Sequence, residues 1–152
     1  MTEKPLFVIL DGYSMAYRHY HGTLKQQLTA PDGGPTGAIY GFARQILDIM
    51  LKDKPKYVAV AWDAGLSGRE QVYPDYKANR DLPPDDFEPQ VERIYEVLGA
   101  LNVPALKLEG YEADDVIGTL VREAETQGVH SRIVTGDGDL LQLITDNTDV
   151  FL

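Results

Sequence analysis

Short apolar segments alternate with amphipathic segments along nearly the whole chain, and this alternation limits the fold more than any other feature. The apolar segments predict buried strands at 6–10 (LFVIL), 57–62 (YVAVAW), 104–108 (PALKL), 131–135 (SRIVT) and 149–152 (DVFL). Strands that alternate with helices favour an α/β fold with a mostly parallel central sheet flanked by helices.

Helices are predicted where apolar residues recur every three or four positions, at 35–53, 87–102 and 116–124. The 152 residues suit one domain spanning 1–152, because a chain of about 150 residues buries roughly 68–70% of its unfolded surface. No repeat of fixed period interrupts the pattern. We therefore expect a single domain built on one sheet.

The composition excludes several classes of protein. The chain has no cysteine, which rules out disulfide frameworks, thiolate nucleophiles and cysteine-based zinc or iron–sulfur sites. No apolar run approaches the ~18 residues of a membrane span, and the apolar part of the amino-terminal segment is too short for a signal peptide, so we expect a cytoplasmic protein with no membrane partner. The formal net charge of −10 argues against a protein whose main function is nonspecific binding of nucleic-acid phosphates. If several of the acids bind cations, however, the formal charge overstates how negative the working surface is, so a nucleic-acid enzyme is not excluded.

Carboxylates follow most of the predicted strands. One Asp follows the first strand and one the second, a pair follows the fourth, and three acids open the helix of the stretch EGYEADDVIGTL after the third. In open α/β sheets a site forms at the carboxyl ends of the strands, so we expect these acids to face one rim. They are Asp11, Asp63, Glu112, Asp114, Asp115, Asp137 and Asp139.

Several ionised carboxylates cannot share one pocket unaided. Two unit charges ~4 Å apart repel by about 4 kcal/mol at an effective dielectric constant near 20. Cations would remove this repulsion, and a donor set made only of oxygens favours Mg²⁺ or Mn²⁺ over zinc. Paired divalent ions promote phosphodiester hydrolysis by activating water and stabilising the charge that develops. The alternative to a metal site is that these acids are ordinary turn and helix-cap residues. That explanation would have to apply independently at every strand end.

The segment 64–84 lacks regular periodicity and contains the stretch VYPDYKANR. Loops of this length in compact domains are usually functional or mobile. Aromatic and basic residues alternate here, which suits bases stacking on rings while cations hold phosphates. The nucleic-acid-binding candidates are Arg69, Tyr73, Tyr76, Lys77 and Arg80, together with Arg18 from the segment after the first strand.

Six motifs occur in register across the chain: LDGYSMAYR, PTGAIYGF, YVAVAWDA, YPDYKANR, EGYEADDVIGTL and TGDGDLLQL. Together they resemble the amino-terminal 5′ nuclease (5′-to-3′ exonuclease) domain of bacterial DNA polymerase I, within the flap endonuclease superfamily. The resemblance implies a PIN-like, resolvase-like core that uses two divalent ions. It also implies hydrolysis of DNA or RNA phosphodiesters at 5′ flaps, nicks and RNA primers during replication and repair.

The motif match also assigns roles to residues. The seven acids would bind metal, and catalysis would fall to Asp11, Asp63, Asp115 and Asp137. The 5′ strand would be held near the scissile phosphate by Arg18, Lys77 and Arg80, and 64–84 would form part of an arch around a single strand. Activated water would attack phosphorus, with no protein nucleophile.

The sequence departs from the family pattern in two ways. The family usually has Lys or Arg between the last two acids, where this chain has Gly138, so a cation beside the metal site is missing. The family also continues past the position of Leu152 with another acid pair, a helix-hairpin-helix region that holds duplex DNA, and a polymerase domain. We therefore expect either the amino-terminal part of a longer nuclease or a short stand-alone relative.

Three other functions stay open on the sequence alone. A PIN-type ribonuclease would share the acidic pocket and would cleave plain single-stranded RNA. A non-catalytic module would bind branched DNA or metal without turnover, which Gly138 favours. A phosphoryl-transfer enzyme with an aspartyl nucleophile at Asp11 would form a covalent phosphoaspartate.

Overall fold

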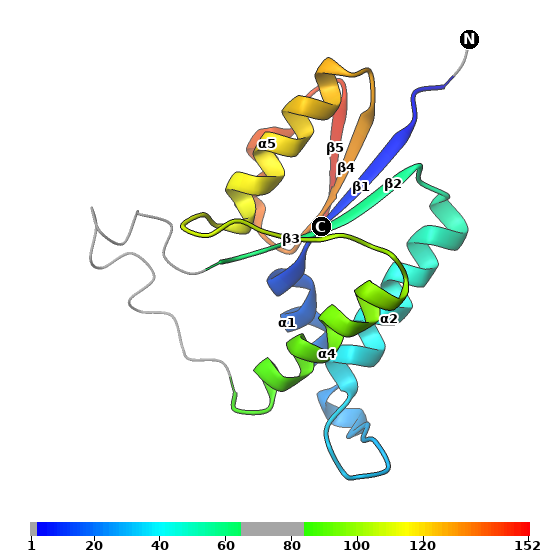
Figure 1. Cartoon of the computed structure of the whole chain (residues 1–152), viewed down its shortest axis with the longest axis vertical. Coiled ribbons are helices and arrows are strands. Elements are labelled where there is room, and N and C mark those ends of the chain that lie inside the picture. Colours follow the sequence, from blue (N-terminus) through cyan, green and yellow to red (C-terminus); the bar gives the residue numbers. More distant parts are fainter. Residues whose placement is uncertain (1–2, 65–83) are drawn as a thin grey trace.

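A sheet of five parallel strands forms the centre of the computed structural model, which describes residues 3–64 and 84–152. The strands are β1 (Leu6–Asp11), β2 (Tyr57–Trp62), β3 (Ala105–Lys107), β4 (His130–Val134) and β5 (Thr148–Phe151). They lie in the order β3-β2-β1-β4-β5, and all neighbours are parallel (Figure 1). The predicted α/β fold with a parallel sheet is therefore confirmed, including the strand at the end of the chain.

Helices connect the strands. The longer ones are α1 (Gly12–Gly22), α2 (Gly37–Asp48), α4 (Phe87–Ala100) and α5 (Ala113–Thr126). Shorter helical segments span Leu24–Gln26, Ile49–Asp53 and Gly138–Leu143. Within the described ranges, no helix combines the length and apolarity that crossing a bilayer requires.

The helix predictions hold for α2, α4 and α5, while α1 was missed. Its buried positions include Met15, Ala16 and Tyr20, but tyrosines, histidines and an arginine between them obscure the helical period. Helix α5 begins three residues earlier than its apolar spacing predicts, because the acidic segment itself forms the first turn.

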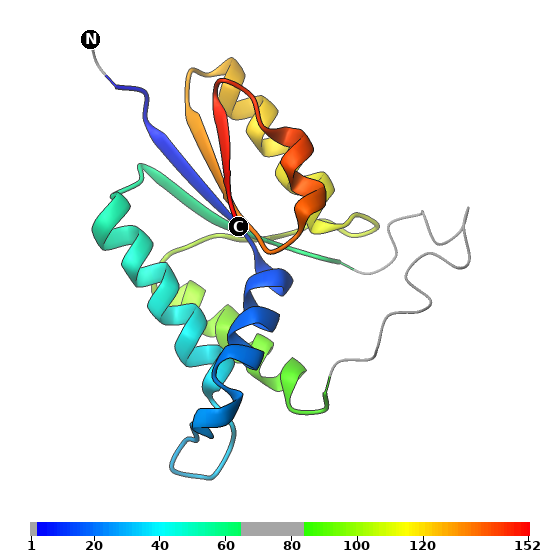
Figure 2. The ribbon, with the colours of Figure 1, turned by 180° about the vertical axis from the view of Figure 1, so that it is seen from behind.

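The two faces of the sheet carry separate hydrophobic cores. On one face Val8 and Leu10 of β1 pack with Trp62 of β2 against α1, α2 and α4. On the other face Ile9 of β1 and Ile133 of β4 pack against α5 and the segment 138–143. Figures 1 and 2 show these layers from opposite sides. Alternate residues of β1 thus serve opposite cores, as expected of a central strand covered on both faces.

Strand β1 is the point where the order of the strands reverses. The chain places β2 and β3 successively on one side of β1, then crosses to place β4 and β5 on the other. Asp11 lies opposite Ala61 of β2, and Leu10 lies opposite Val134 of β4. The carboxyl ends of β1 and β4 therefore meet at a topological switch point, where open α/β sheets bind ligands.

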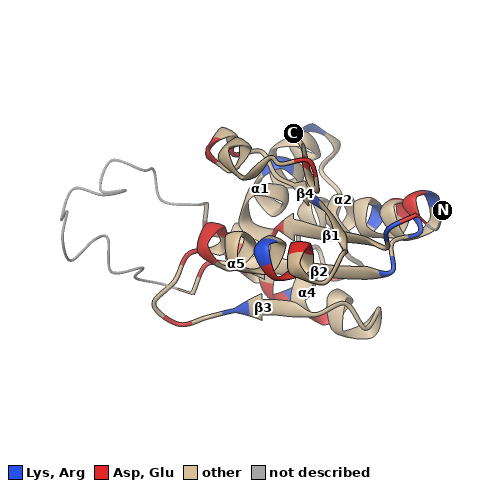
Figure 3. Cartoon of the chain, turned by 90° about the horizontal axis from the view of Figure 1, so that it is seen from above, with Lys and Arg blue, Asp and Glu red and all other residues tan. Residues whose placement is uncertain are grey.

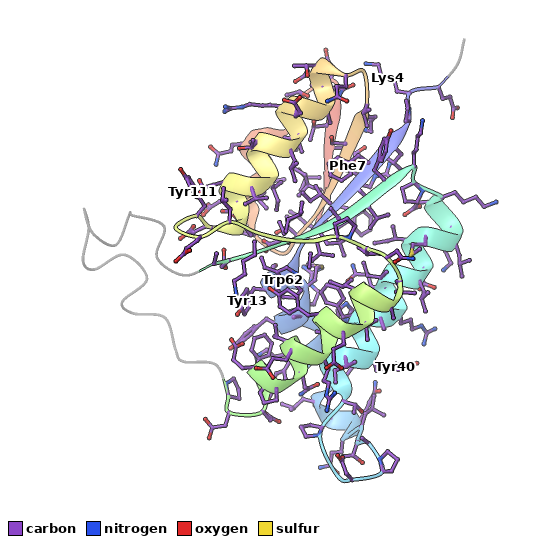
Figure 4. The ribbon with its side chains drawn as sticks, in the orientation of Figure 1. Lys4, Phe7, Tyr13, Tyr40, Trp62 and Tyr111 are labelled. Carbon is purple, nitrogen blue, oxygen red and sulfur yellow. The ribbon has the colours of Figure 1, made fainter. Side chains whose placement is uncertain are left out.

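Trp62, at the carboxyl end of β2, anchors the helical layer. Its ring is fully buried and lies 5.5 Å from that of Tyr13, measured between centroids; Figure 4 labels both residues. The centroid of the Phe42 ring lies 5.9 Å from that of Trp62. The first residue of α1, Gly12, passes so close that a Cβ atom there would lie 2.5 Å from Trp62 Cδ2. Only a residue without a side chain lets α1 start at this place.

Replacing Gly12 with Ala is expected to destabilise the fold by about 1–3 kcal/mol, because the added methyl group overpacks the Trp62 ring. Urea denaturation measures the loss. Gly22→Ala, at the other end of α1, is the matched control, because a Cβ atom there meets no atom within 4 Å. Equal stabilities of the two variants would contradict the close-approach argument.

An ion-pair group joins β4 to β5. Asp149 accepts hydrogen bonds from Arg132 Nε and from His130 Nε2, each at 2.8 Å. Burial works to raise the pKa of Asp149, but the bonds from Arg132 and His130 together hold it below the ordinary value of 3.8. The folded state therefore favours the ionised carboxylate.

Asp149→Asn is expected to destabilise the chain at about pH 7, and the difference from wild type should vanish in acid. A carboxyl whose pKa is lowered on folding contributes stability above its unfolded pKa and loses it as the pH falls through the folded value, here below 3.8. Denaturation at about pH 7 and about pH 2 tests this. Asp48→Asn, which breaks an exposed 4.0 Å ion pair with Lys52, should change stability little.

Candidate functional site

Asp11 lies at the centre of the rim, at the end of β1. It is 6% exposed, and its Oδ2 accepts a hydrogen bond of 2.9 Å from Thr135 Oγ1. Burial raises the pKa of the Asp11 carboxyl from 3.8 to about 7; the Thr135 bond opposes the rise, and the negative charges of Asp114 and Asp63 add to it. The sheet thus holds a poorly solvated carboxyl beside two other acids.

Asp63 follows β2 directly and connects that strand to α5. Its Oδ1 accepts a 2.7 Å hydrogen bond from the backbone N–H of Ala113, the first residue of α5. The next residue, Ala64, donates its N–H to the carbonyl of Tyr111 at 3.3 Å. An acid that accepts a first-turn N–H stabilises a helix start, so Asp63 fixes where α5 begins relative to the sheet.

The acids of α5 are arranged around its first turn. Glu112 is the N-cap residue and forms a reciprocal capping box with Asp115. The Glu112 backbone N–H donates to Asp115 Oδ2 at 3.1 Å, and the Glu112 carboxylate faces the Asp115 N–H. Glu112 is buried, while Asp114 and Asp115 are half-buried. Figure 3 marks the acidic residues of α5 in red.

The turn after β4 supplies the remaining acids. The Asp137 backbone N–H donates to Thr135 Oγ1 at 3.0 Å, and Asp137 Oδ1 accepts the Asp139 N–H at 2.9 Å. The N–H of Gly136 donates to Ser14 Oγ of α1 at 2.8 Å. The Gly136 bond attaches the turn to the start of α1, and the bond from Thr135 to Asp11 attaches it to the end of β1.

Arg18 of α1 also lies beside this turn. A Cβ atom on Gly136 would lie 2.9 Å from Ser14 Oγ and 3.1 Å from Arg18 Nη2. The small residue therefore leaves room for the guanidinium next to the acidic turn. Gly138, by contrast, has open space around it, since a Cβ atom there would meet no atom of the described residues within 4 Å.

The structure brings most of the predicted acids to one edge of the sheet. Asp11 interacts with Asp63 and Asp114, Asp63 binds the first turn of α5, and Asp137 reaches Asp11 through Thr135. Asp139 is exposed, and its backbone N–H donates a hydrogen bond to Asp137 Oδ1. The binding candidates Arg69, Tyr73, Tyr76, Lys77 and Arg80, and all of the arch-like region 64–84 except its two end residues, lie outside the described residues.

The acids do not form a closed metal cage. Across residues 3–64 and 84–152, no three His, Cys, Asp or Glu side chains are arranged to hold one ion together. Carboxylate oxygens of Asp11, Asp63 and Asp137 instead accept hydrogen bonds from the chain's own donors. The donor set is nevertheless entirely oxygen and carries the concentrated negative charge that a divalent cation would neutralise, so its chemistry fits such an ion.

Sequence reasoning missed two polar residues that hold the rim together, Thr135 and Ser14. Thr135 bonds both the Asp11 side chain and the Asp137 backbone, and Ser14 fixes Gly136. The only signal for Thr135 was its place, directly after an apolar strand and two residues before an acid. From the sequence, Thr135 is only the last residue of a predicted strand, because a single hydroxyl gives no indication of its hydrogen-bond partners.

A parallel sheet with reversed strand order and acids at the carboxyl ends of its strands defines a resolvase-like α/β domain with an acidic rim. A family model described as "5′-3′ exonuclease, N-terminal resolvase-like domain" matches residues 6–152. The chain belongs to this family. The identification made from the six motifs is therefore confirmed.

Similar proteins include DNA polymerase I of Chloroflexus aurantiacus, 46% identical over 148 residues, which cover 97% of this chain and 16% of that protein. A 5′-3′ exonuclease of Aquifex aeolicus is 41% identical over 140 residues, 91% of this chain and 48% of that protein. The chain thus spans less than half the length of these two relatives.

Solved structures share the fold. The T5 D15 protein co-crystallised with metal ions superposes with a TM-score of 0.76 at 21% identity, over 96% of this chain and 54% of that one. The T5 5′-exonuclease with bound zinc gives a TM-score of 0.77 at 22% identity, with the same coverage. At this identity the likeness shows a shared fold.

Asp11→Asn is expected to raise the free energy of unfolding of the metal-free chain by roughly 1–3 kcal/mol at about pH 8, because the amide removes a charge that burial and two neighbouring acids disfavour. A carboxyl whose pKa is raised on folding loses stability as the pH rises through that value. Urea denaturation in EDTA measures the gain. Asp149→Asn should shift stability in the opposite direction; a loss in both variants would contradict the charge argument.

Proposed function

We propose that this chain is the core of a divalent-metal-dependent 5′ nuclease that hydrolyses phosphodiesters of DNA or RNA with 5′ ends or flaps. The observation that carries the proposal is the acidic rim, where Asp11 is buried at the switch point and Asp63 and Asp114 lie close enough to affect its pKa. Several of these acids also accept N–H groups of the chain, but their concentration at one rim costs stability unless a cation neutralises the charge.

The ions would be Mg²⁺ or Mn²⁺, two in the complete protein, held by carboxylates of the rim. The candidate ligands are Asp11, Asp63, Glu112, Asp114, Asp115, Asp137 and Asp139. When bound, divalent ions activate water and stabilise the charge that develops on a phosphoryl group. Oxygen donors of this kind are the ones that such ions prefer.

The chain's own residues would orient the acids and the substrate. Asp11 is fixed by Thr135, and Asp63 is fixed by the first N–H of α5, so two of the carboxylates start from set positions on different elements. Arg18, beside the turn that carries Asp137, would hold a phosphate of the 5′ strand, since a guanidinium can pair with two phosphate oxygens at once.

The substrate would be DNA with 5′ flaps, nicks or RNA primers, in replication or repair. A flap endonuclease complex with DNA and metal ions is among the solved structures that share this fold, at 22% identity. Residues 1–152 would form one nuclease core in which 64–84 arches over a single strand. A following duplex-binding region and polymerase domain would complete the protein, an arrangement supported by the greater length of the polymerase relatives.

Asp137→Asn is expected to reduce cleavage of an end-labelled 5′-flap DNA duplex by more than the ~10–100-fold typical of outer-shell changes at metal sites, because it removes the negative charge of a proposed ligand. The assay is run with Mg²⁺ and with Mn²⁺, and EDTA should abolish cleavage by the unaltered chain. Glu123→Gln, on the exposed side of α5, is the matched control and should cleave normally.

Other outcomes distinguish the other functions. Full activity of Asp137→Asn would contradict the assignment of the rim. Preferred cleavage of plain single-stranded RNA would favour a PIN-type ribonuclease. Metal-dependent binding of the flap by a folded chain, without cleavage, would favour a binding module, and a covalent phosphoaspartate at Asp11 would favour phosphoryl transfer.

A further inference from the structure

Thr135 stands between two acids that come from different parts of the chain. The last paired residues of β1 and β4 are Leu10 and Val134, so regular sheet pairing between these strands ends just before the acids. Beyond it, the hydroxyl of Thr135 bonds Asp11 Oδ2 at 2.9 Å and the Asp137 backbone N–H at 3.0 Å. A side chain thus continues the link between the strands where the backbone pairing stops.

The direction of these bonds is fixed by chemistry. A backbone N–H can only donate, so Thr135 Oγ1 accepts from Asp137 and is left with its single proton to donate to the Asp11 carboxylate. Bonds arranged head to tail in this way polarise and strengthen one another in a poorly solvated site. Thr135 is 0% exposed, so water does not compete for its hydroxyl.

The surrounding contacts restrict Thr135 further. Its backbone N–H donates to the carbonyl of Phe151 on β5 at 3.1 Å, and its branched side chain has few rotamers available. The neighbouring Gly136 is held by Ser14 Oγ at 2.8 Å. The hydroxyl therefore occupies a set position between Asp11 and the turn that carries Asp137.

We propose that Thr135 is a positioning residue that aligns Asp11 with the Asp137 turn so that both carboxylates can serve one divalent-metal site. This inference rests on the proposed function. Metal sites require ligands held within about 0.5 Å of their working positions, and outer-shell hydrogen bonds commonly supply that restraint. Without the hydroxyl, Asp11 would keep the backbone N–H of Ser14 but lose its side-chain donor, and the Asp137 N–H would lose its acceptor.

The test is a calorimetric titration of the chain with Mn²⁺. Thr135→Val keeps the shape of the side chain and removes both hydrogen bonds, and it is expected to weaken Mn²⁺ binding by about 10–100-fold. Thr135→Ser keeps the hydroxyl and should bind within about threefold of wild type, a rescue that a purely packing role would not produce. Thr135→Ala, which needs no new space, is measured alongside in case the valine variant does not fold.

Ser131→Ala is the matched control. Ser131 is also 0% exposed and lies in β4, but its hydroxyl has no hydrogen-bond partner among the described residues, so its removal should leave Mn²⁺ affinity unchanged. Amide hydrogen exchange gives a second readout, in which Asp137 N–H should exchange faster in Thr135→Val than in Thr135→Ser.

The outcomes separate the two claims. Unchanged Mn²⁺ affinity in both Thr135→Val and Thr135→Ala would overturn the role of Thr135 and leave the proposed function standing. Equal weakening in the serine and valine variants would also overturn it, because the hydroxyl would then not matter. No Mn²⁺ binding by the unaltered, folded chain would overturn the metal-dependent function itself, and the role of Thr135 with it.

Discussion

Parallel pairing of β1 with β2 on one side and β4 on the other is the interaction on which the rest of the structure depends. Because β1 is hydrogen-bonded along both edges and covered on both faces, its end is fixed in all directions. That end is Asp11. Every other part of the rim is positioned from it, through the strands that flank β1 and the helices that start beyond them.

The acids of the rim have two roles that compete for the same carboxylate oxygens, one structural and one as candidate metal ligands. As structural acids, Asp63 and Asp115 accept N–H groups at the start of α5, and Asp137 accepts one in the turn after β4. As candidate ligands, the same carboxylates would turn oxygens toward a cation. The shared positions are physically reasonable, because a helix start and a divalent ion both favour negative charge, and the chain can keep the acids ordered by its own donors before an ion binds.

Much of the architecture could be predicted, because each element has a local signal. Five apolar segments became the five strands, and three amphipathic segments became α2, α4 and α5. Helix α1 was not predicted because polar and aromatic residues between its buried positions obscure the helical period. The edge strand β3 is shorter than its apolar run.

The sequence by itself determined the order of strands and helices, the acids that follow the strands, and the family motifs. Tertiary structure decided which acids meet, that Asp11 is buried among negative charges, and that Thr135 joins it to the Asp137 turn. The physical reason is range. Hydrophobic period and strand ends are local properties, whereas the hydrogen bond from Thr135 to Asp11 joins residues 124 positions apart and exists only once β4 has paired with β1.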